Sequence, residues 1–158
     1  GIANTRVMRN VLLYAKDFGA LIVHHAEDPW LSDGASMNSG ELSSRLGLPG
    51  THRFAETIVL ERDVRLVEMT GGRYHAANIS TAESLEVIRR AKVRKLPVTA
   101  AVSINHLTLN ENDIGPYRTF LKLSPPLRTE QDRAFDAGIA GECGNQRFDI
   151  GIARRLGS

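Results

Sequence analysis

The sequence predicts an α/β fold with parallel strands, and three observations lead to this prediction. Segments with the apolar spacing of a half-buried helix alternate with short, continuous apolar runs along the chain. The runs lack the polar–apolar alternation of a half-exposed strand, which indicates strands covered on both faces, as in a parallel sheet. Polar and ionisable residues follow directly after the runs, at the ends of strands where parallel α/β proteins place functional groups.

The first unit is a helix followed by a strand. Asn4 and Thr5 can cap the helix, and Gly19 is expected to end it in a left-handed conformation. The strand is the apolar run Ala20–Val23, which leads directly into two histidines and two acidic residues. The helix is expected to bury one face, formed by Val7, Val11, Leu12, Ala15 and Phe18.

Two further helix–strand units follow. The second helix is expected from about Arg53 to Met69, and the second strand from Arg73 to Ile79. Ser80 and Glu83 form a capping box, which predicts the start of the third helix, and Leu96–Val102 is the third strand. The expected inward-facing positions are Ala55, Ile58, Val59, Leu66 and Met69 on the second helix, and Leu85, Ile88 and Ala91 on the third.

The remaining segments are less regular. Pro29–Gly50 is rich in Ser, Gly, Asn and Pro, and long structured loops tend to carry function. Thr129 is expected to open a short fourth helix near Asp132–Ile139. Three parallel strands leave open edges and an uncovered face. We therefore expect that the chain is a piece of a larger fold or that a partner completes it, and that the isolated chain is poorly soluble or oligomeric.

The composition excludes several classes of protein. The chain has 158 residues, of which 42% are hydrophobic and 24% charged, and a formal net charge of only +2. Because basic and acidic residues are interspersed, we expect neither a nucleic-acid nor a membrane partner. No apolar run approaches the roughly 18 residues of a membrane span. The single cysteine, Cys143, excludes an internal disulfide and fits a reducing compartment, so we expect a cytoplasmic location.

His25 is the first candidate metal ligand. It follows a buried strand and precedes Glu27 and Asp28, and a neutral imidazole with a carboxylate near its other ring nitrogen can bind zinc. On spacing alone, one histidine with two acids fits a half-buried histidine hydrogen-bonded to a loop carbonyl better. His24 should point to the opposite side of the strand and pack against a helix.

The later strands offer further candidates. Asn78 ends the second strand by position and fits a loop hydrogen bond better than a transition-metal site, while His75 should face the helix layer. Asn105 and His106 follow the third strand, where His106 could contact a ligand or cap a loop. Arg128 could bind a carboxylate or phosphate, or form a salt bridge with Asp132 or Glu130.

Several strings, taken together and in order, resemble the dihydroorotase branch of the amidohydrolase superfamily. The resemblance covers residues 1–141, and 142–158 form a divergent tail of unknown structure. The strings are His25-Ala26-Glu27-Asp28, Met37-Asn38-Ser39-Gly40, Leu46-Gly47-Leu48-Pro49-Gly50, Ile79-Ser80-Thr81-Ala82-Glu83-Ser84, His106-Leu107-Thr108-Leu109, Pro125-Pro126-Leu127-Arg128 and Asp132-Arg133.

The resemblance implies part of a TIM-type (β/α) barrel, roughly strands five to seven with their flanking helices. It also implies a zinc site that opens a cyclic amide in pyrimidine synthesis. His25 matches the family's ligand on the fifth strand. Asn78 stands where the family has a histidine ligand, and Ser124 stands where it has a substrate-binding asparagine. Asn105 and His106 are further candidates for substrate binding.

Two hypotheses follow from the resemblance. In the first, the parent protein is a zinc-dependent hydrolase that interconverts dihydroorotate and carbamoyl aspartate, while this chain alone is inactive and retains no zinc. In the second, the protein is a non-catalytic scaffold that partners aspartate transcarbamoylase. The changes at Asn78 and Ser124 favour the scaffold, and the retained His25 favours the enzyme. A homo-oligomer is expected in either case.

Overall fold

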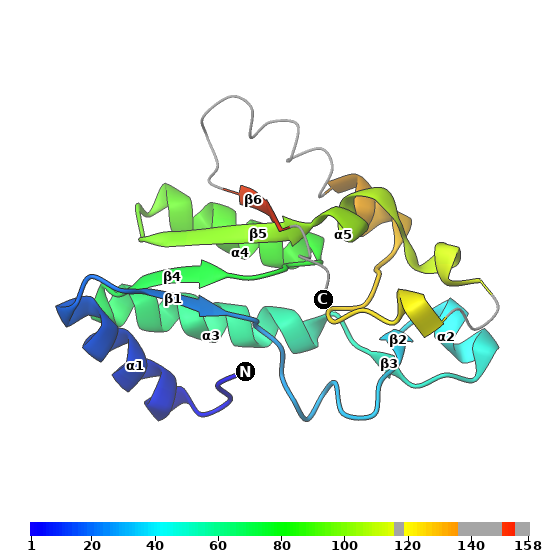
Figure 1. Cartoon of the computed structure of the whole chain (residues 1–158), viewed down its shortest axis with the longest axis horizontal. Coiled ribbons are helices and arrows are strands. Elements are labelled where there is room, and N and C mark those ends of the chain that lie inside the picture. Colours follow the sequence, from blue (N-terminus) through cyan, green and yellow to red (C-terminus); the bar gives the residue numbers. More distant parts are fainter. Residues whose placement is uncertain (116–118, 136–149, 154–158) are drawn as a thin grey trace.

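The computed structural model describes residues 1–115, 119–135 and 150–153. A sheet of four parallel strands in the order β1-β4-β5-β6 forms its centre (Figure 1). The fold is therefore α/β with parallel strands, as predicted. The elements are α1 (Thr5–Asp17), β1 (Leu21–His24), β2 (Met37–Asn38), α2 (Glu41–Leu46), β3 (Gly50–Thr51), α3 (Phe54–Thr70), β4 (Arg73–Ala76), α4 (Ala82–Val93), β5 (Val98–Ser103), α5 (Ile104–Thr108), the 3-10 turns η1 (Glu111–Ile114) and η2 (Thr119–Leu121), and β6 (Ile150–Ala153).

The helix ends follow local sequence signals. The Asn4 side chain accepts a hydrogen bond from the backbone N–H of Val7 and caps α1, and Gly19 has a φ of 64° just after the helix. The cap of α4 differs from the prediction, because Thr81 rather than Ser80 accepts from the backbone N–H of Ser84. Ser80 is instead drawn into a buried network described below.

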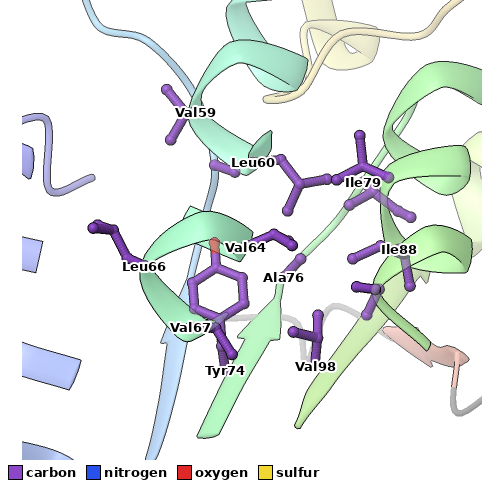
Figure 2. Close-up of a cluster of buried hydrophobic side chains, with 14 of the residues drawn as sticks. Val59, Leu60, Val64, Leu66, Val67, Tyr74, Ala76, Ile79, Ile88 and Val98 are labelled. Atoms are coloured by element: carbon purple, nitrogen blue, oxygen red, sulfur yellow. The ribbon is translucent and has the colours of Figure 1, made fainter. Parts of the chain in front are cut away.

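The main core lies between the sheet and the layer formed by α1, α3 and α4. Figure 2 shows α3 side chains meeting Tyr74 and Ala76 of β4, Ile88 of α4 and Val98 of β5. The predicted inner face of α4 (Leu85, Ile88, Ala91) is buried. The prediction was wrong for Val7, Phe18, Ile58 and Met69, which are exposed, while Met8 and Leu60 are fully buried instead.

The opposite face of the sheet is less covered. Leu21 and Val23 of β1 are 41% and 62% exposed, so β1 is not buried on both faces as the apolar run suggested. His75 lies on this face, beside Thr99, whose Oγ1 is 2.7 Å from His75 Nδ1. The prediction that His75 faces the helices was therefore wrong, because its neighbour Tyr74 takes that side.

His24 faces the helices, as predicted. Its Nδ1 lies 2.7 Å from Oδ2 of Asp63 on α3, and the hydroxyl of Tyr74 donates to the same carboxylate oxygen at 2.8 Å. Its Nε2 accepts a hydrogen bond from the backbone N–H of Ile2 at 2.9 Å. The histidine therefore joins α3, β4 and the N-terminal segment across the core.

The long segment between β1 and α3 contains structure of its own. Its two short strands β2 and β3 pair in parallel, and α2 lies between them in the chain. A second apolar cluster fixes this segment to the chain that follows β5. The cluster consists of Met37, Ile114 and Leu127, with Leu42, Leu46, Leu48, Leu109, Leu121 and Leu123 packed against it.

A buried polar network connects these parts. Glu56 of α3 accepts hydrogen bonds from the backbone N–H and the hydroxyl of Ser80, at 2.9 and 2.5 Å. The guanidinium of Arg128 donates to the Ser80 hydroxyl at 3.0 Å and lies 3.8 Å from the Glu56 carboxylate. It also donates to the side chain of Asn38 at 2.8 Å and to the carbonyl of Thr51 at 3.2 Å. Both charged groups are at most 4% exposed.

Arg128 therefore does not form the predicted salt bridge with Asp132 or Glu130. Arg53 binds Asp132 instead, with its Nη2 2.5 Å from Oδ1, and Arg133 binds Glu130 at the same distance.

The predicted fourth helix is present over residues 130–135, and the rest of its predicted range lies outside the described residues. Within the predicted tail, β6 pairs in parallel with β5. Among the described residues, no helix is long and apolar enough to cross a membrane.

Replacing Arg128 by Met should destabilise the fold by about 3–5 kcal/mol, because the Glu56 charge would be left buried without its partner. The matched substitution Arg90→Met removes an ion pair between exposed side chains, Arg90 and Glu61, and should cost less than about 1 kcal/mol. Urea unfolding followed by circular dichroism measures both losses. Equal losses of unfolding free energy in the two variants would show that the buried network does not stabilise the contact between the β1–α3 connection and the segment around Arg128.

Candidate functional site

Polar side chains gather at the carboxyl end of the sheet, the side on which β2, β3 and α5 lie in Figure 1. His25 follows β1 directly, and its Nε2 is 3.0 Å from Oε2 of Glu27 and 3.2 Å from Oγ of Ser124. The Ser124 hydroxyl donates to the same Glu27 oxygen at 2.9 Å. Two predicted site residues, His25 and Ser124, thus meet although 99 positions separate them in the sequence.

The charges of this cluster support one another. The hydrogen bond to Glu27 raises the pKa of His25, and burial opposes this effect. The hydrogen bond to His25 lowers the pKa of Glu27, with Ser124 and Arg128 acting in the same direction. The arrangement therefore favours an imidazolium–carboxylate pair. Both side chains remain partly open to solvent, at 33% and 21% exposure.

The geometry differs from the expected metal-ligand arrangement. We expected a carboxylate at one ring nitrogen of His25 and a free nitrogen for the metal. Instead, Glu27 and Ser124 share Nε2, and Nδ1 lies 3.5 Å from the carbonyl of Ala77. A metal bound at Nε2 would require Glu27 and Ser124 to move away. His25 as a metal ligand therefore remains a prediction.

Asn78 lies next to Ala77, two residues beyond the end of β4. Its backbone is left-handed, with a φ of 56°, a conformation in which asparagine and histidine are the more common non-glycine residues. Within the described part of the chain, its amide is not joined to the His25 cluster by a hydrogen bond, and no group of three or more His, Cys, Asp or Glu side chains could hold a metal ion.

His106 secures the segment that carries Ser124. It is 4% exposed on α5, and its Nε2 lies 3.1 and 3.2 Å from the carbonyls of Pro125 and Pro126. Because prolines have no N–H, the carbonyls of Pro125 and Pro126 are the only backbone groups of these two residues that can form such hydrogen bonds. The predicted loop contact is therefore present, and contact of His106 with a ligand remains a prediction. Asn105, its neighbour on α5, makes no side-chain hydrogen bond to the His25 cluster in the described residues.

A cavity of about 350 Å³ adjoins the cluster. Glu27 and Ser124 contribute to its wall, together with Ser36, Thr51 and Lys122. Sequence reasoning assigned no role to Lys122 or to Glu56. The alternation of Leu121, Lys122 and Leu123 in a segment ending at Ser124 was the available signal for Lys122. Glu56 gave none, because its partners are distant in sequence.

Comparisons with known proteins agree on the relationship. Residues 1–84 match the family model described as dihydro-orotase-like. The chain is 41% identical over 140 residues to a dihydroorotase of Syntrophobacter fumaroxidans, covering 88% of this chain and 32% of that protein. It is 44% identical over 126 residues to a dihydroorotase of Streptomyces coelicolor, covering 80% and 29%. The chain thus spans about a third of the length of these relatives.

Solved structures show the same fold. A D-hydantoinase from Bacillus sp. AR9 superposes with a TM-score of 0.74 at 20% identity, covering 95% of this chain and 34% of that chain. A dihydroorotase from Campylobacter jejuni superposes with a TM-score of 0.67 at 14% identity, covering 96% and 39%.

His106 should make the fold sensitive to acid. Burial lowers its pKa, so the folded protein favours the neutral ring. In the unfolded chain, the pKa of His106 is about 6.5. The contribution of neutral His106 to the free energy of unfolding is therefore complete above that pH. It is lost as the pH falls toward the lowered pKa of His106 in the folded protein.

The variants His106→Gln and His106→Leu test this expectation by urea unfolding between about pH 5 and pH 8. Both should flatten the pH dependence, because neither side chain titrates. Only His106→Leu should lose about 1–3 kcal/mol at pH 8, because it leaves the two proline carbonyls without a donor. An unchanged slope in both variants would rule out His106 as the source.

Proposed function

The chain belongs to the dihydroorotase-like family, and from this premise we propose that it contributes part of the catalytic barrel of a cyclic amidohydrolase. The reaction would interconvert dihydroorotate and carbamoyl aspartate. The observation that carries the proposal is the cluster of His25, Glu27 and Ser124 at the carboxyl ends of parallel strands, beside a cavity of about 350 Å³. Functional groups of barrel enzymes occupy this edge.

Four parallel strands with helices along one face support a partial (β/α) barrel, roughly its fifth to seventh strands and a further strand, β6. The remaining strands and their residues would come from a longer protein. The relatives' length, about three times that of this chain, is consistent with this arrangement.

Metal dependence is proposed for the longer protein. A zinc site of this type needs ligands from several strands. The described residues supply one suitable imidazole, His25, and no group of three ligands. These described residues do not form a metal site by themselves.

The chain's own groups can bind and orient a cyclic amide. The Ser124 hydroxyl lines the cavity 3.2 Å from Nε2 of His25, and it can turn from Glu27 toward a ring carbonyl or ring nitrogen in the cavity. His25 can hold a proton at Nε2 with Glu27 as its counter-charge. Together they provide hydrogen-bond donors where negative charge develops during ring opening.

A non-catalytic scaffold that partners aspartate transcarbamoylase is the second candidate. The engagement of both ring nitrogens of His25 by the chain favours it. The family resemblance also favours it, since it implies a histidine ligand at the position that Asn78 occupies. In that case the site residues serve the fold rather than a reaction.

Metal content and ring opening of the full-length protein, with and without Asn78→His, separate the two candidates. The left-handed backbone at 78 accepts histidine, so the variant should fold. A direct ligand should matter at least as much as groups that orient ligands, whose loss costs roughly 10–100-fold in metal affinity. Asn78→His should therefore raise zinc affinity by about tenfold or more, while the control Asn78→Gln should not.

Wild-type ring opening that a chelator abolishes would establish the enzyme. Its absence in the wild type, together with co-purification of aspartate transcarbamoylase, would establish the scaffold. The isolated 158-residue chain should show neither stoichiometric zinc nor turnover. Robust turnover by the pure chain would contradict the view that the site needs residues from elsewhere.

A further inference from the structure

The cavity beside the His25 cluster is rich in hydrogen-bond donors. Its polar wall comes from two segments, the connection from β1 to α3 and the residues before Pro126. Ser36 and Thr51 line the cavity from the first segment, and Lys122 and Ser124 from the second. Glu27 is the one carboxylate of the wall, and it is already engaged by His25 and Ser124. Ser32 also lines the cavity, and its hydroxyl donates to the carbonyl of Asp28. Among the described lining residues, the polar side-chain groups without a hydrogen bond are therefore the hydroxyls of Ser36 and Thr51 and the ammonium of Lys122.

Lys122 is the only cation among the residues that line this cavity. Its side chain is exposed and lines the cavity, and within the described residues its ammonium forms neither an ion pair nor a hydrogen bond. By contrast, several basic side chains elsewhere have an acidic partner, such as Arg53 with Asp132 and Arg133 with Glu130. The charge of Glu27 in the same wall is paired with His25, so Lys122 adds an unpaired positive charge to the cavity lining.

The backbone of Lys122 is held in place from both sides. Leu121 and Leu123 pack against the second apolar cluster, and His106 holds the carbonyls of Pro125 and Pro126. The lysine side chain thus projects from an anchored segment that also carries Ser124. An exposed lysine on such a support can reach a ligand without a large loss of backbone freedom.

A carboxylate is the group that fits these donors. The ammonium can form a charge-assisted hydrogen bond with a carboxylate oxygen, and serine and threonine hydroxyls can donate to its second oxygen. The volume of about 350 Å³ suits a small ring with one such substituent.

We propose that Lys122 is a specificity-determining residue that binds the carboxylate of an acidic cyclic amide, whose ring then lies toward Ser124 and His25. This proposal rests on the proposed function for the identity of the ring. A neutral cyclic amide leaves Lys122 without a partner and loses this contribution to binding.

Calorimetric binding to the full-length protein tests the proposal with dihydroorotate and with dihydrouracil, which has the same ring without the carboxylate. Lys122→Met should weaken dihydroorotate binding by about tenfold or more, the usual effect of removing a hydrogen bond to a charged group. It should leave dihydrouracil binding unchanged, and Lys122→Arg should retain most of the affinity for dihydroorotate. The control Lys95→Met removes an exposed charge just before β5, at the other end of the sheet, and should change neither affinity.

The proposal is overturned if wild-type protein does not prefer dihydroorotate, or if Lys122→Met weakens both ligands equally or neither. An unchanged urea midpoint in Lys122→Met shows that the variant is folded.

The binding measurement also separates this proposal from the proposed function. Selective loss of dihydroorotate binding without ring opening leaves the carboxylate site standing and removes the enzyme. Ring opening by the wild type, together with unchanged dihydroorotate binding by Lys122→Met, supports the enzyme and rules out the carboxylate site.

Discussion

The ion pair between Glu56 and Arg128 lies where three parts of the chain meet. Glu56 belongs to α3, Ser80 to the loop before α4, and Arg128 to the segment that follows η2. The hydroxyl of Ser80 connects the two charges, since it donates to Glu56 and accepts from Arg128. Two desolvated charges are costly unless paired and fully hydrogen-bonded. The arrangement of lowest free energy is therefore the one in which these three segments are in contact, so this polar contact stabilises their relative positions.

The geometry of the candidate site depends on this contact together with the sheet. His25 is placed by the sheet, because it continues β1. Ser124 is placed by the segment that Arg128 anchors at one end and His106 holds at Pro125 and Pro126. The cavity wall between them needs the pairing of β2 with β3, whose Asn38 and Thr51 both bind the guanidinium of Arg128. A single buried cation thus keeps both walls of the cavity facing each other.

The sequence predicted what depends on local periodicity and capping, and it failed where distant partners decide. Asn4 and the buried face of α4 needed only neighbours in the chain. Ile58 and Met69 have the right helical spacing, but spacing cannot tell whether anything covers that side of α3. The prediction for His75 was wrong because it assumes strict alternation along a strand that extends to Ile79. The strand ends at Ala76, and the left-handed residue 78 interrupts the alternation.

The same distinction applies to the site. His25 and Ser124 were predicted by resemblance to a family, whereas their contact with each other required the fold. That contact makes two uses of His25 mutually exclusive. Glu27 stabilises the protonated ring, while a metal needs the neutral ring with a free nitrogen. Which state prevails depends on whether further ligands gather near Nε2 strongly enough to displace both Glu27 and Ser124. We propose that residue 78 influences this balance, because an imidazole there would add a nitrogen ligand next to Ala77, whose carbonyl lies 3.5 Å from Nδ1 of His25.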